Sequence, residues 1–562
     1  MAPERRKINL MGNHPSANQS TDGNRPDLIA DWEHLFKVFI RPEDNASRAT
    51  LIKYMEQILF GLHDFLRKHV GITEAKSLKD LSERFTDTVI RENPEKKLAD
   101  VITCVIDDIA PHAVNVASPY FVGHMTSAIP FFMVHLKTIV AALNQNVVKL
   151  ETSKVVSIIE KQVIAKIHRM IFENSEAFYR EHVQNTETTL GAFVEGGTSA
   201  NLTALWVARN ARLSPKPGFD GIEMDGIAAA YKAHGIDRAV ILVSRLGHYS
   251  LRKAAGILGI GNKNVIPIDT DECNKIDLQA LRRTIRELEA DQKTGIIAVV
   301  GIAGATETGT IDPLPEMADI CAEHGIHLHV DAAWGGPTLF SGKYKHLLDG
   351  IKRADSVTID GHKQFYMLMS CGMVYFKSPT AMDVIAYYAN YVNRRGSVDL
   401  GIKSLSGSRE ANSLILDSAL KIMGTKGYEL LINHGIETAA AFADEIERRE
   451  NFELVTAPEL NILTYRLCPP ALHNQLTSAD SEARQAANER LNAINRNLQR
   501  LQREAGWSFV SRTALKMDPA DASGSQVVLR AVIMNPMTTL GILTEILDEQ
   551  EEIYHTYLAG DF

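Results

Sequence analysis

Residues 327–335 read His-Leu-His-Val-Asp-Ala-Ala-Trp-Gly, and Asp-Gly-His-Lys follows at 360–363. The first stretch is an apolar strand that ends in Asp331, and the second places Lys363 in a polar turn after another apolar run. Pyridoxal 5'-phosphate (PLP) chemistry requires these two groups, because a lysine bonds to the cofactor's aldehyde and an acid keeps a proton on the ring nitrogen. The pair therefore predicts a PLP enzyme in which Lys363 and Asp331 are catalytic.

Seven apolar runs alternate with helical stretches through the middle of the chain. They span 190–194, 238–243, 264–268, 296–301, 326–330, 356–359 and 371–376. Strands separated by helices predict a mainly parallel sheet with helices on both faces. After about residue 400 the pattern predicts long helices, one of them at 486–503, and an antiparallel strand pair, 460–466 with 525–534. We therefore expect an α/β protein with a seven-stranded sheet and a small α+β C-terminal domain.

The length of 562 residues exceeds that of one ordinary domain. Residues 1–27 are rich in Asn, Ser, Pro and Gly, which predicts a flexible tail. Residues 28–110 show helical periodicity and predict an N-terminal helical segment. Further helices are expected at about 131–150 and 153–174. We place a large PLP-binding domain at 111–400 and a small domain at 401–562.

The amino-acid composition limits which binding partners and which cellular compartment we expect for this protein. The net charge is −9 and no long Lys/Arg block is present, which argues against nucleic acid as a partner. No apolar run approaches the length of a membrane span. The five cysteines are scattered and form no CxxC pair, which favours a reducing compartment. We expect a cytoplasmic protein that binds no membrane.

Residues 191–201, Gly-Ala-Phe-Val-Glu-Gly-Gly-Thr-Ser-Ala-Asn, predict a strand, a tight glycine turn and the start of a helix. Gly197 lets the backbone approach an anion, and Thr198 and Ser199 can donate hydrogen bonds to it. A helix N-terminus adds favourable potential for a phosphate. The alternative interpretation is a plain strand-to-helix turn with a hydroxyl cap.

Two further turns follow predicted strands and can reach a bound ring. His248 follows the strand at 238–243, at the edge of the sheet where ligands collect in α/β proteins, and its imidazole can stack on a pyridine. Thr306 lies in the turn 304–310 and can reach the ring or its substituents. A polar loop histidine and ordinary turn chemistry are the alternatives for these two residues.

Three other classes of protein compete with this interpretation. His327, His329 and Asp331 share one strand face and could bind zinc in a metal-dependent hydrolase. That interpretation leaves the glycine turn and Lys363 without roles, so we assign no residue to a metal. A non-catalytic scaffold and an aminotransferase on the same fold are the other two alternatives.

The motifs together resemble those of the group II PLP-dependent amino-acid decarboxylases, which include glutamate, cysteine-sulfinate and aromatic amino-acid decarboxylases. The matching segments are 329–333, 362–363, 196–198 with Asn201, 248–250, 253–255 and 258–261. The resemblance runs from about residue 110 to the C-terminus. It implies the PLP-dependent transferase fold type I, with an N-terminal helical arm, and a homodimer.

The resemblance also implies a role for each matched residue. Lys363 carries the cofactor beside His362, and Asp331 pairs with its ring nitrogen. His248 stacks on one face of the ring and Ala333 packs on the other, while Thr198 and Ser199 hold the phosphate. Arg409, in Gly-Ser-Arg at 407–409, would bind the substrate α-carboxylate. For the proton donor, Tyr391 in the lid is the nearest candidate and His248 is the fallback.

The substrate is indicated only indirectly. His124 lies in the segment 123–127 that the resemblance places around the substrate side chain. Arg394, Arg395 and Lys403 flank the lid and favour an acidic side chain. The lid residues are most similar to those of bacterial PLP-dependent aspartate 1-decarboxylases, which implies decarboxylation of L-aspartate to β-alanine for pantothenate biosynthesis. L-Glutamate, giving 4-aminobutyrate, and cysteine sulfinate are the alternative substrates.

Overall fold

The computed structural model describes residues 31–32, 45–67, 70–71, 78–388, 397, 399–476, 480–516 and 525–559. The expected tail at 1–27 lies outside these residues. The chain divides into two compact units, residues 1–65 with 76–111 and residues 66–75 with 112–562. The sheet, the expected site and the C-terminal segment all belong to the second unit.

The first unit is helical. Its described elements are α2 (Asn45–Leu66), α3 (Leu78–Glu83), α4 (Leu98–Cys104), η1 (Val105–Ile109) and η2 (Ala110–His112). The side-chain amide of Gln57 donates to Thr103 over 3.3 Å, and Gly61 faces Ile106 so closely that an added Cβ would clash. α2 therefore packs on α4 and η1 because a glycine leaves room there.

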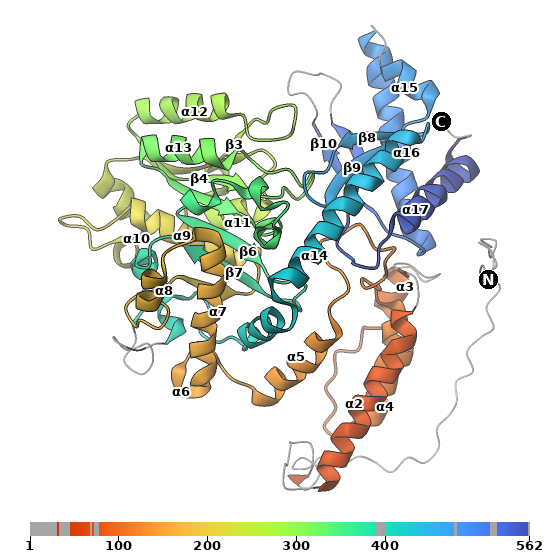
Figure 1. The fold of residues 1–562 in the computed structure, drawn as a ribbon, viewed down its shortest axis with the longest axis horizontal. Helices are drawn as coiled ribbons and strands as arrows, with labels where there is room; N and C mark the ends of the chain where they lie inside the picture. The colour runs from red at the N-terminus through yellow and green to blue at the C-terminus, as the bar shows by residue number, and fades with distance from the viewer. Residues whose placement is uncertain are drawn as a thin grey trace. The chain divides into compact units, whose positions relative to one another are not determined.

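The second unit is built on a mixed sheet of seven strands (Figure 1). They are β1 (Gly191–Val194), β2 (Arg238–Ser244), β3 (Val265–Ile268), β4 (Thr294–Ile302), β5 (His327–Asp331), β6 (Ser356–Asp360) and β7 (Gly372–Phe376). Their order is β1-β7-β6-β5-β4-β2-β3, and only β7 runs antiparallel to its neighbours. The expected mainly parallel, seven-stranded sheet is confirmed.

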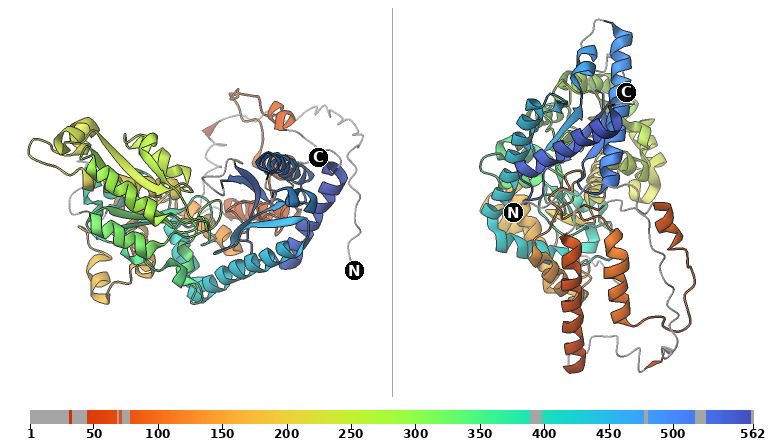
Figure 2. Two further views of the ribbon diagram at one scale, coloured as in Figure 1. Left: turned by 90° about the horizontal axis from the view of Figure 1, so that it is seen from above. Right: turned by 90° about the vertical axis from the view of Figure 1, so that its right-hand side faces the viewer.

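Alternation along β2 shows how the sheet is covered on both faces. Val240 and Leu242 belong to the core cluster that includes side chains of α7 (Val155–Phe172), α12 (Leu278–Ala290) and α13 (Leu314–His324). Ala239, Ile241 and Val243 belong to the cluster with α9 (Gly197–Arg212) and α11 (Tyr249–Ile257). Successive side chains of a strand point to opposite faces, so each buried strand joins two helical layers (Figure 2).

The remaining helices before the C-terminal segment are α5 (Phe131–Leu143), α6 (Leu150–Ser153), α8 (Glu176–His182) and α10 (Ile222–His234). The helix expected at 131–150 is shorter than predicted. It ends because Asn144 takes a left-handed conformation, with φ 47°, which asparagine tolerates better than most residues. The helix expected at 153–174 is α7.

The C-terminal segment forms a second, four-stranded sheet with long helices. It contains α14 (Asn412–Arg448), β8 (Phe452–Thr456), β9 (Ile462–Leu467), α15 (Pro470–Leu476), α16 (Ser481–Ala505), β10 (Ser511–Leu515), β11 (Gln526–Val532), α17 (Leu540–Ile553) and η9 (Tyr554–Leu558). Strand order is β10-β11-β9-β8, and all three pairs are antiparallel. The expected pairing of β9 with β11 and the expected helix within α16 are confirmed; β8 and β10 were not predicted.

One buried histidine links α7 to α8 and to β7 of the large sheet. His168 has no exposed surface, accepts from the Tyr179 hydroxyl over 2.9 Å and donates to the Phe376 carbonyl over 3.0 Å. Burial lowers the pKa of His168 to about 4, so the folded protein holds the neutral ring.

We expect His168 to make the protein sensitive to mild acid. The unfolded chain takes up a proton near pH 6.5 and the folded chain only near 4, so stability is lost as pH falls through this window, by up to about 3 kcal/mol. Thermal unfolding of the cofactor-free protein from pH 7 to 4.5 measures the loss. His168→Gln should flatten this dependence and the exposed His346→Gln should not; equal slopes would contradict the assignment.

Candidate active site

A cavity of about 470 Å3 lies at the carboxyl ends of β4, β5 and β6. Parallel register carries Ile302 of β4, Asp331 of β5 and Thr358 of β6 to one edge of the sheet. The cavity brings together ten of the residues selected from the sequence: His124, Gly197, Thr198, Ser199, His248, Thr306, Asp331, Ala333, His362 and Lys363. Their individual roles stay predictions.

The turn between β1 and α9 forms one wall of the cavity. Gly197 is required there, because an added Cβ would lie 2.9 Å from a carboxylate oxygen of Asp360. Thr198 and Ser199 follow in the first turn of α9, a helix of 16 residues whose free N–H groups favour an anion. Glu195, just before the turn, accepts a hydrogen bond from the Ser406 hydroxyl.

Lys363 lies beside a carboxylate that the sequence analysis did not select. Its Nζ is 3.2 Å from Oδ2 of Asp360, and the two side chains are only 18% and 4% exposed. The second oxygen of Asp360, Oδ1, is buried without a hydrogen-bond partner. Nδ1 of the adjacent His362 donates to the Cys371 carbonyl over 2.8 Å, which fixes the ring. The turn therefore holds the lysine amine next to a buried carboxylate that forms an ion pair with it.

Asp331 is held by two donors at the end of β5. Nδ2 of Asn201 donates to its Oδ2 over 2.8 Å, and the backbone N–H of Ala333 donates to its Oδ1 over 3.2 Å. Only 7% of the residue is exposed. A buried carboxylate with two neutral donors and no cation among the described hydrogen bonds and ion pairs is electrostatically incomplete, and a protonated pyridine nitrogen would complete it.

Asn201 is the centre of a hydrogen-bond network that determines which histidine nitrogens carry protons. Both of its N–H groups donate, one to Asp331 and one to Ser250 Oγ over 3.0 Å, so its oxygen must accept from Nε2 of His329 over 3.0 Å. Ser250 in turn donates to Nδ1 of His248 over 2.8 Å. The two residues expected to contact the ring, Asp331 and His248, are therefore oriented by one amide.

The same network rules out the metal-hydrolase alternative for these strands. Nδ1 of His329 and Nε2 of His327 both bond to Ser356 Oγ, over 2.9 and 2.8 Å. Burial lowers the pKa of His329 to about 4 and also lowers the pKa of His327, so both rings are neutral hydrogen-bond partners. Among the described residues, His327, His329 and Asp331 do not form a set whose ligand atoms converge on one point.

Two histidines face the cavity from other elements. Burial lowers the pKa of His248, and its Nδ1 accepts, so its Nε2 carries the proton. Burial, with Arg530 and Lys363 nearby, lowers the pKa of His124, whose Nδ1 lies 3.2 Å from Thr126 Oγ1. Both rings are therefore neutral at pH 7, and each can serve as a hydrogen-bonding group of the cavity.

Arg409 lies elsewhere. It lines a second cavity, of about 320 Å3, together with Lys403, and its guanidinium forms a two-pronged pair with the buried carboxylate of Glu160. Its side chain is 8% exposed and that of Glu160 3%. The structure thus does not bring Arg409 to Lys363, and its role toward the substrate stays a prediction. Tyr391, Arg394 and Arg395 lie outside the described residues.

Arg530 of β11 takes a position that the sequence analysis missed. It lines the cavity of Lys363, donates to the carbonyls of Thr306 and Gly123 over 2.9 and 3.2 Å, and keeps a buried Nε–H without a partner. It is 8% exposed. A signal existed, because a lone arginine within the apolar run Val-Val-Leu-Arg-Ala-Val requires a buried partner. Arg530 lies far from the other motifs in the sequence, so the sequence did not indicate which groups it would contact.

The residues present fit PLP. The cavity offers a lysine amine, a carboxylate that lacks a described cation, a glycine turn at a helix N-terminus and the imidazole of His248. These groups match the aldehyde, the ring nitrogen, the phosphate and the ring face of the cofactor in turn. Lys363, Asp331, Thr198 with Ser199, and His248 are the residues that would hold it.

We expect Asn201→Ala to weaken PLP binding about 10- to 100-fold. Residues that hold the directly binding side chains in place typically contribute this much to affinity. The substitution removes one donor from Asp331 and also releases Ser250 and His248. Equilibrium dialysis of PLP against wild type and variant measures the change. Asn497→Ala, on α16, is the control, and an unchanged dissociation constant for Asn201→Ala would contradict the proposed function of the network.

Comparison with known proteins agrees with the geometry. Residues 81–468 match the model of the pyridoxal-dependent decarboxylase conserved domain. The chain is 44% identical to an aspartate 1-decarboxylase from Aliivibrio fischeri, over 95% of this chain and 96% of that protein. It is 29% identical to the acidic amino acid decarboxylase GADL1 of Bos taurus, over 74% and 75% of the two chains.

The fold also matches solved structures. The crystal structure of mouse CSAD aligns with a TM-score of 0.77, at 23% identity, over 90% of this chain and 98% of that one. Such a likeness shows the architecture. Taken with the family match, which covers well over half of the residues, it leads to one conclusion: the chain belongs to the pyridoxal-dependent decarboxylase family and is a PLP-dependent amino-acid decarboxylase.

Proposed function

We propose that this enzyme removes the α-carboxylate of L-aspartate, giving β-alanine and CO2. The observation that carries the proposal is the 44% identity with the Aliivibrio fischeri aspartate 1-decarboxylase over nearly the whole of both chains. A second relative, named L-aspartate decarboxylase dtxS4, from Metarhizium robertsii, is 30% identical over 77% of this chain and 82% of its own.

The cavity supports an acidic substrate. Besides Lys363, the basic side chain among its described lining residues is Arg530, accompanied by the imidazole of His124. A guanidinium with a free N–H in a buried site is suited to bind a carboxylate, since such charge-assisted pairs are about twice as strong as neutral hydrogen bonds. We propose that Arg530 binds one of the two carboxylates of the substrate.

Each of these residues of the cavity has its own role in the proposed reaction. When bound, PLP supplies an electron sink for the electrons released at Cα. Asp331 would hold a proton on the ring nitrogen, and Asn201 holds Asp331 in place through a hydrogen bond. Lys363 would bond the cofactor aldehyde, and its amine lies beside the Asp360 carboxylate. His248 lines the same cavity and would stack on the ring, and Tyr391, with His248 as the fallback, is the candidate to return a proton to the substrate carbon.

We expect Lys363→Ala to lose both the covalent link to the cofactor and turnover. The absorbance of the lysine-bound cofactor should disappear and product formation should fall to the background, while PLP still binds through the remaining residues. Absorbance spectra and a CO2-release assay on the same sample separate the two effects. A variant with wild-type turnover would disprove the assignment of Lys363.

Arg530→Lys should lower kcat/KM for L-aspartate about 100-fold, equivalent to about 3 kcal/mol, because lysine cannot reproduce a planar guanidinium. Arg409→Lys is the matched comparison. It should chiefly lower thermal stability, since it disrupts a buried pair with Glu160. The reverse result, a large loss of kcat/KM for Arg409→Lys alone, would favour the assignment made from sequence.

A competition assay tests the substrate. Holoenzyme is given equimolar L-aspartate, L-glutamate and cysteine sulfinate, and the three amine products are quantified by mass spectrometry. We expect β-alanine to dominate. An excess of 4-aminobutyrate or of the cysteine-sulfinate product would refute aspartate as the preferred substrate without affecting the family, the cofactor or Lys363.

We further propose that the enzyme is a cytoplasmic homodimer that supplies β-alanine for pantothenate biosynthesis. Free cysteines support a reducing compartment, and no helix in the described part of the chain has the length and apolarity to cross a membrane. Phe131 of α5 and Val155 of α7 are 78% and 59% exposed, and such apolar side chains support a subunit contact. Light scattering of the purified holoenzyme tests the dimer.

A further inference from the structure

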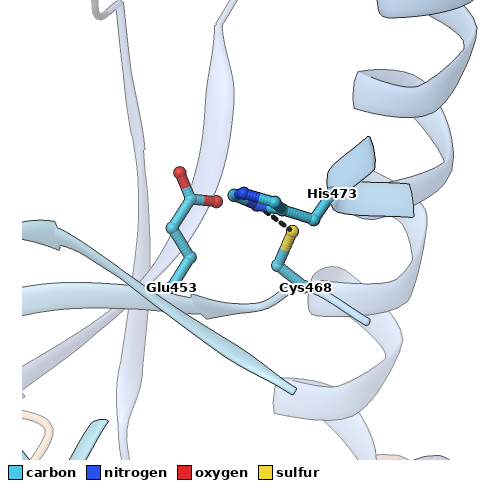
Figure 3. Close-up of side chains that lie close together, drawn as sticks. All are labelled: Glu453, Cys468 and His473. Carbon is cyan, nitrogen blue, oxygen red and sulfur yellow. Dashed lines mark hydrogen bonds between the residues drawn. The ribbon is translucent and has the colours of Figure 1, made fainter. Parts of the chain in front are cut away.

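Three potential metal ligands converge in the C-terminal sheet, apart from the active site. Glu453 belongs to β8, Cys468 directly follows β9 and His473 lies on α15 (Figure 3). One ligand atom from each lies within 4.8 Å of the other two. None of the three lines the cavity of Lys363. Among the described residues, this is the set of histidine, cysteine and acidic side chains whose ligand atoms come together.

Backbone structure brings these residues together. The antiparallel register pairs Glu453 with Arg466, two residues before Cys468, and the Cys468 N–H donates to the Asn451 carbonyl over 2.7 Å. Pro470 then starts α15, and the His473 N–H donates to the Pro469 carbonyl over 3.0 Å. The short connection from β9 to α15 therefore folds the imidazole back over the end of the strand pair.

The distances are close to those of a tetrahedral metal site. Sγ of Cys468 and Nδ1 of His473 are 3.8 Å apart. Ligand atoms of a four-coordinate zinc ion stand about 3.3–3.8 Å apart when its bonds are about 2.0–2.3 Å long. The cysteine and histidine therefore already have the required spacing, and the Glu453 carboxylate, whose side chain is 31% exposed, has an oxygen within 4.8 Å of both.

Arg466 affects this site in two opposing ways. Its Nε donates to Oε2 of Glu453 over 2.6 Å, which orients the carboxylate. Its charge also lies close to the position of a cation. We therefore expect weaker binding than in a four-ligand structural zinc site.

We propose that Glu453, Cys468 and His473 bind one Zn2+ ion, or a similar thiophilic divalent cation, that fastens α15 to β8 and β9. Sulfur, nitrogen and oxygen ligands in one set favour zinc over magnesium or calcium. Three protein ligands leave a fourth position for water. On binding, Cys468 releases its thiol proton to solvent, so the metal bonds to a thiolate. The site is structural in this proposal and does not depend on the substrate of the enzyme.

Cobalt titration of tag-free holoenzyme tests the proposal directly. Tetrahedral Co2+ with a thiolate ligand gives intense visible d–d bands and a sulfur-to-metal charge-transfer band. We expect these bands to saturate at one equivalent and to disappear when Zn2+ is added. Cys468→Ser should abolish the charge-transfer band and His473→Ala should lower the affinity at least tenfold. The exposed Cys273→Ser is the matched control and should bind as wild type.

Thermal unfolding gives a second, independent readout. Zn2+ should raise the Tm of wild type and of Cys273→Ser, but not that of His473→Ala, because only a metal bound to the native state stabilises it. His473 is exposed, so its substitution leaves folding intact and tests the site even if Cys468→Ser is poorly folded. An absence of tetrahedral bands in wild type, or a Co2+ affinity and a Zn2+-induced Tm shift in His473→Ala equal to those of wild type, would overturn the proposal.

Discussion

The buried carboxylate of Asp331 is the constraint on which the site depends. It ends β5 at the edge of the sheet, and its two described donors are neutral. No described cation pairs with this carboxylate, and the protonated ring nitrogen of the cofactor would supply one. Hydrogen bonds link His327 and His329 of β5 through Ser356 of β6, and His329 bonds to Asn201 of α9, which donates to that carboxylate.

Asn201 links this constraint to the rest of the cavity. Because its second N–H bonds to Ser250, the same amide also orients His248 on the neighbouring α11. Asn201 itself lies on α9, the helix whose N-terminus forms the glycine turn. One buried side chain thus ties together the expected contacts to the ring nitrogen, the ring face and the phosphate. A fault in this network would disturb all three contacts at once.

The C-terminal segment takes part in the site as well as in the architecture. β11 carries Arg530 into the cavity of Lys363, whereas Arg409, ahead of α14, is committed to Glu160. The same segment holds Glu453 on β8, Cys468 just after β9 and His473 on α15. The two features share the sheet but no residue, so substrate binding and the proposed metal site can be altered independently.

The sequence alone determined the sheet, its flanking helices and most of the cavity. Apolar runs of strand length fixed seven strands, and the polar residues that follow them had to gather at one edge because parallel strands share their carboxyl ends. Local patterns could not place Arg530, Asp360 or Arg409. These positions depend on which distant groups meet: β11 reaches Thr306 across 224 positions, and Arg409 finds Glu160 across 249. A buried guanidinium needs hydrogen-bond or ion-pair partners wherever the fold places it. Only the tertiary structure decides which groups these are for each arginine.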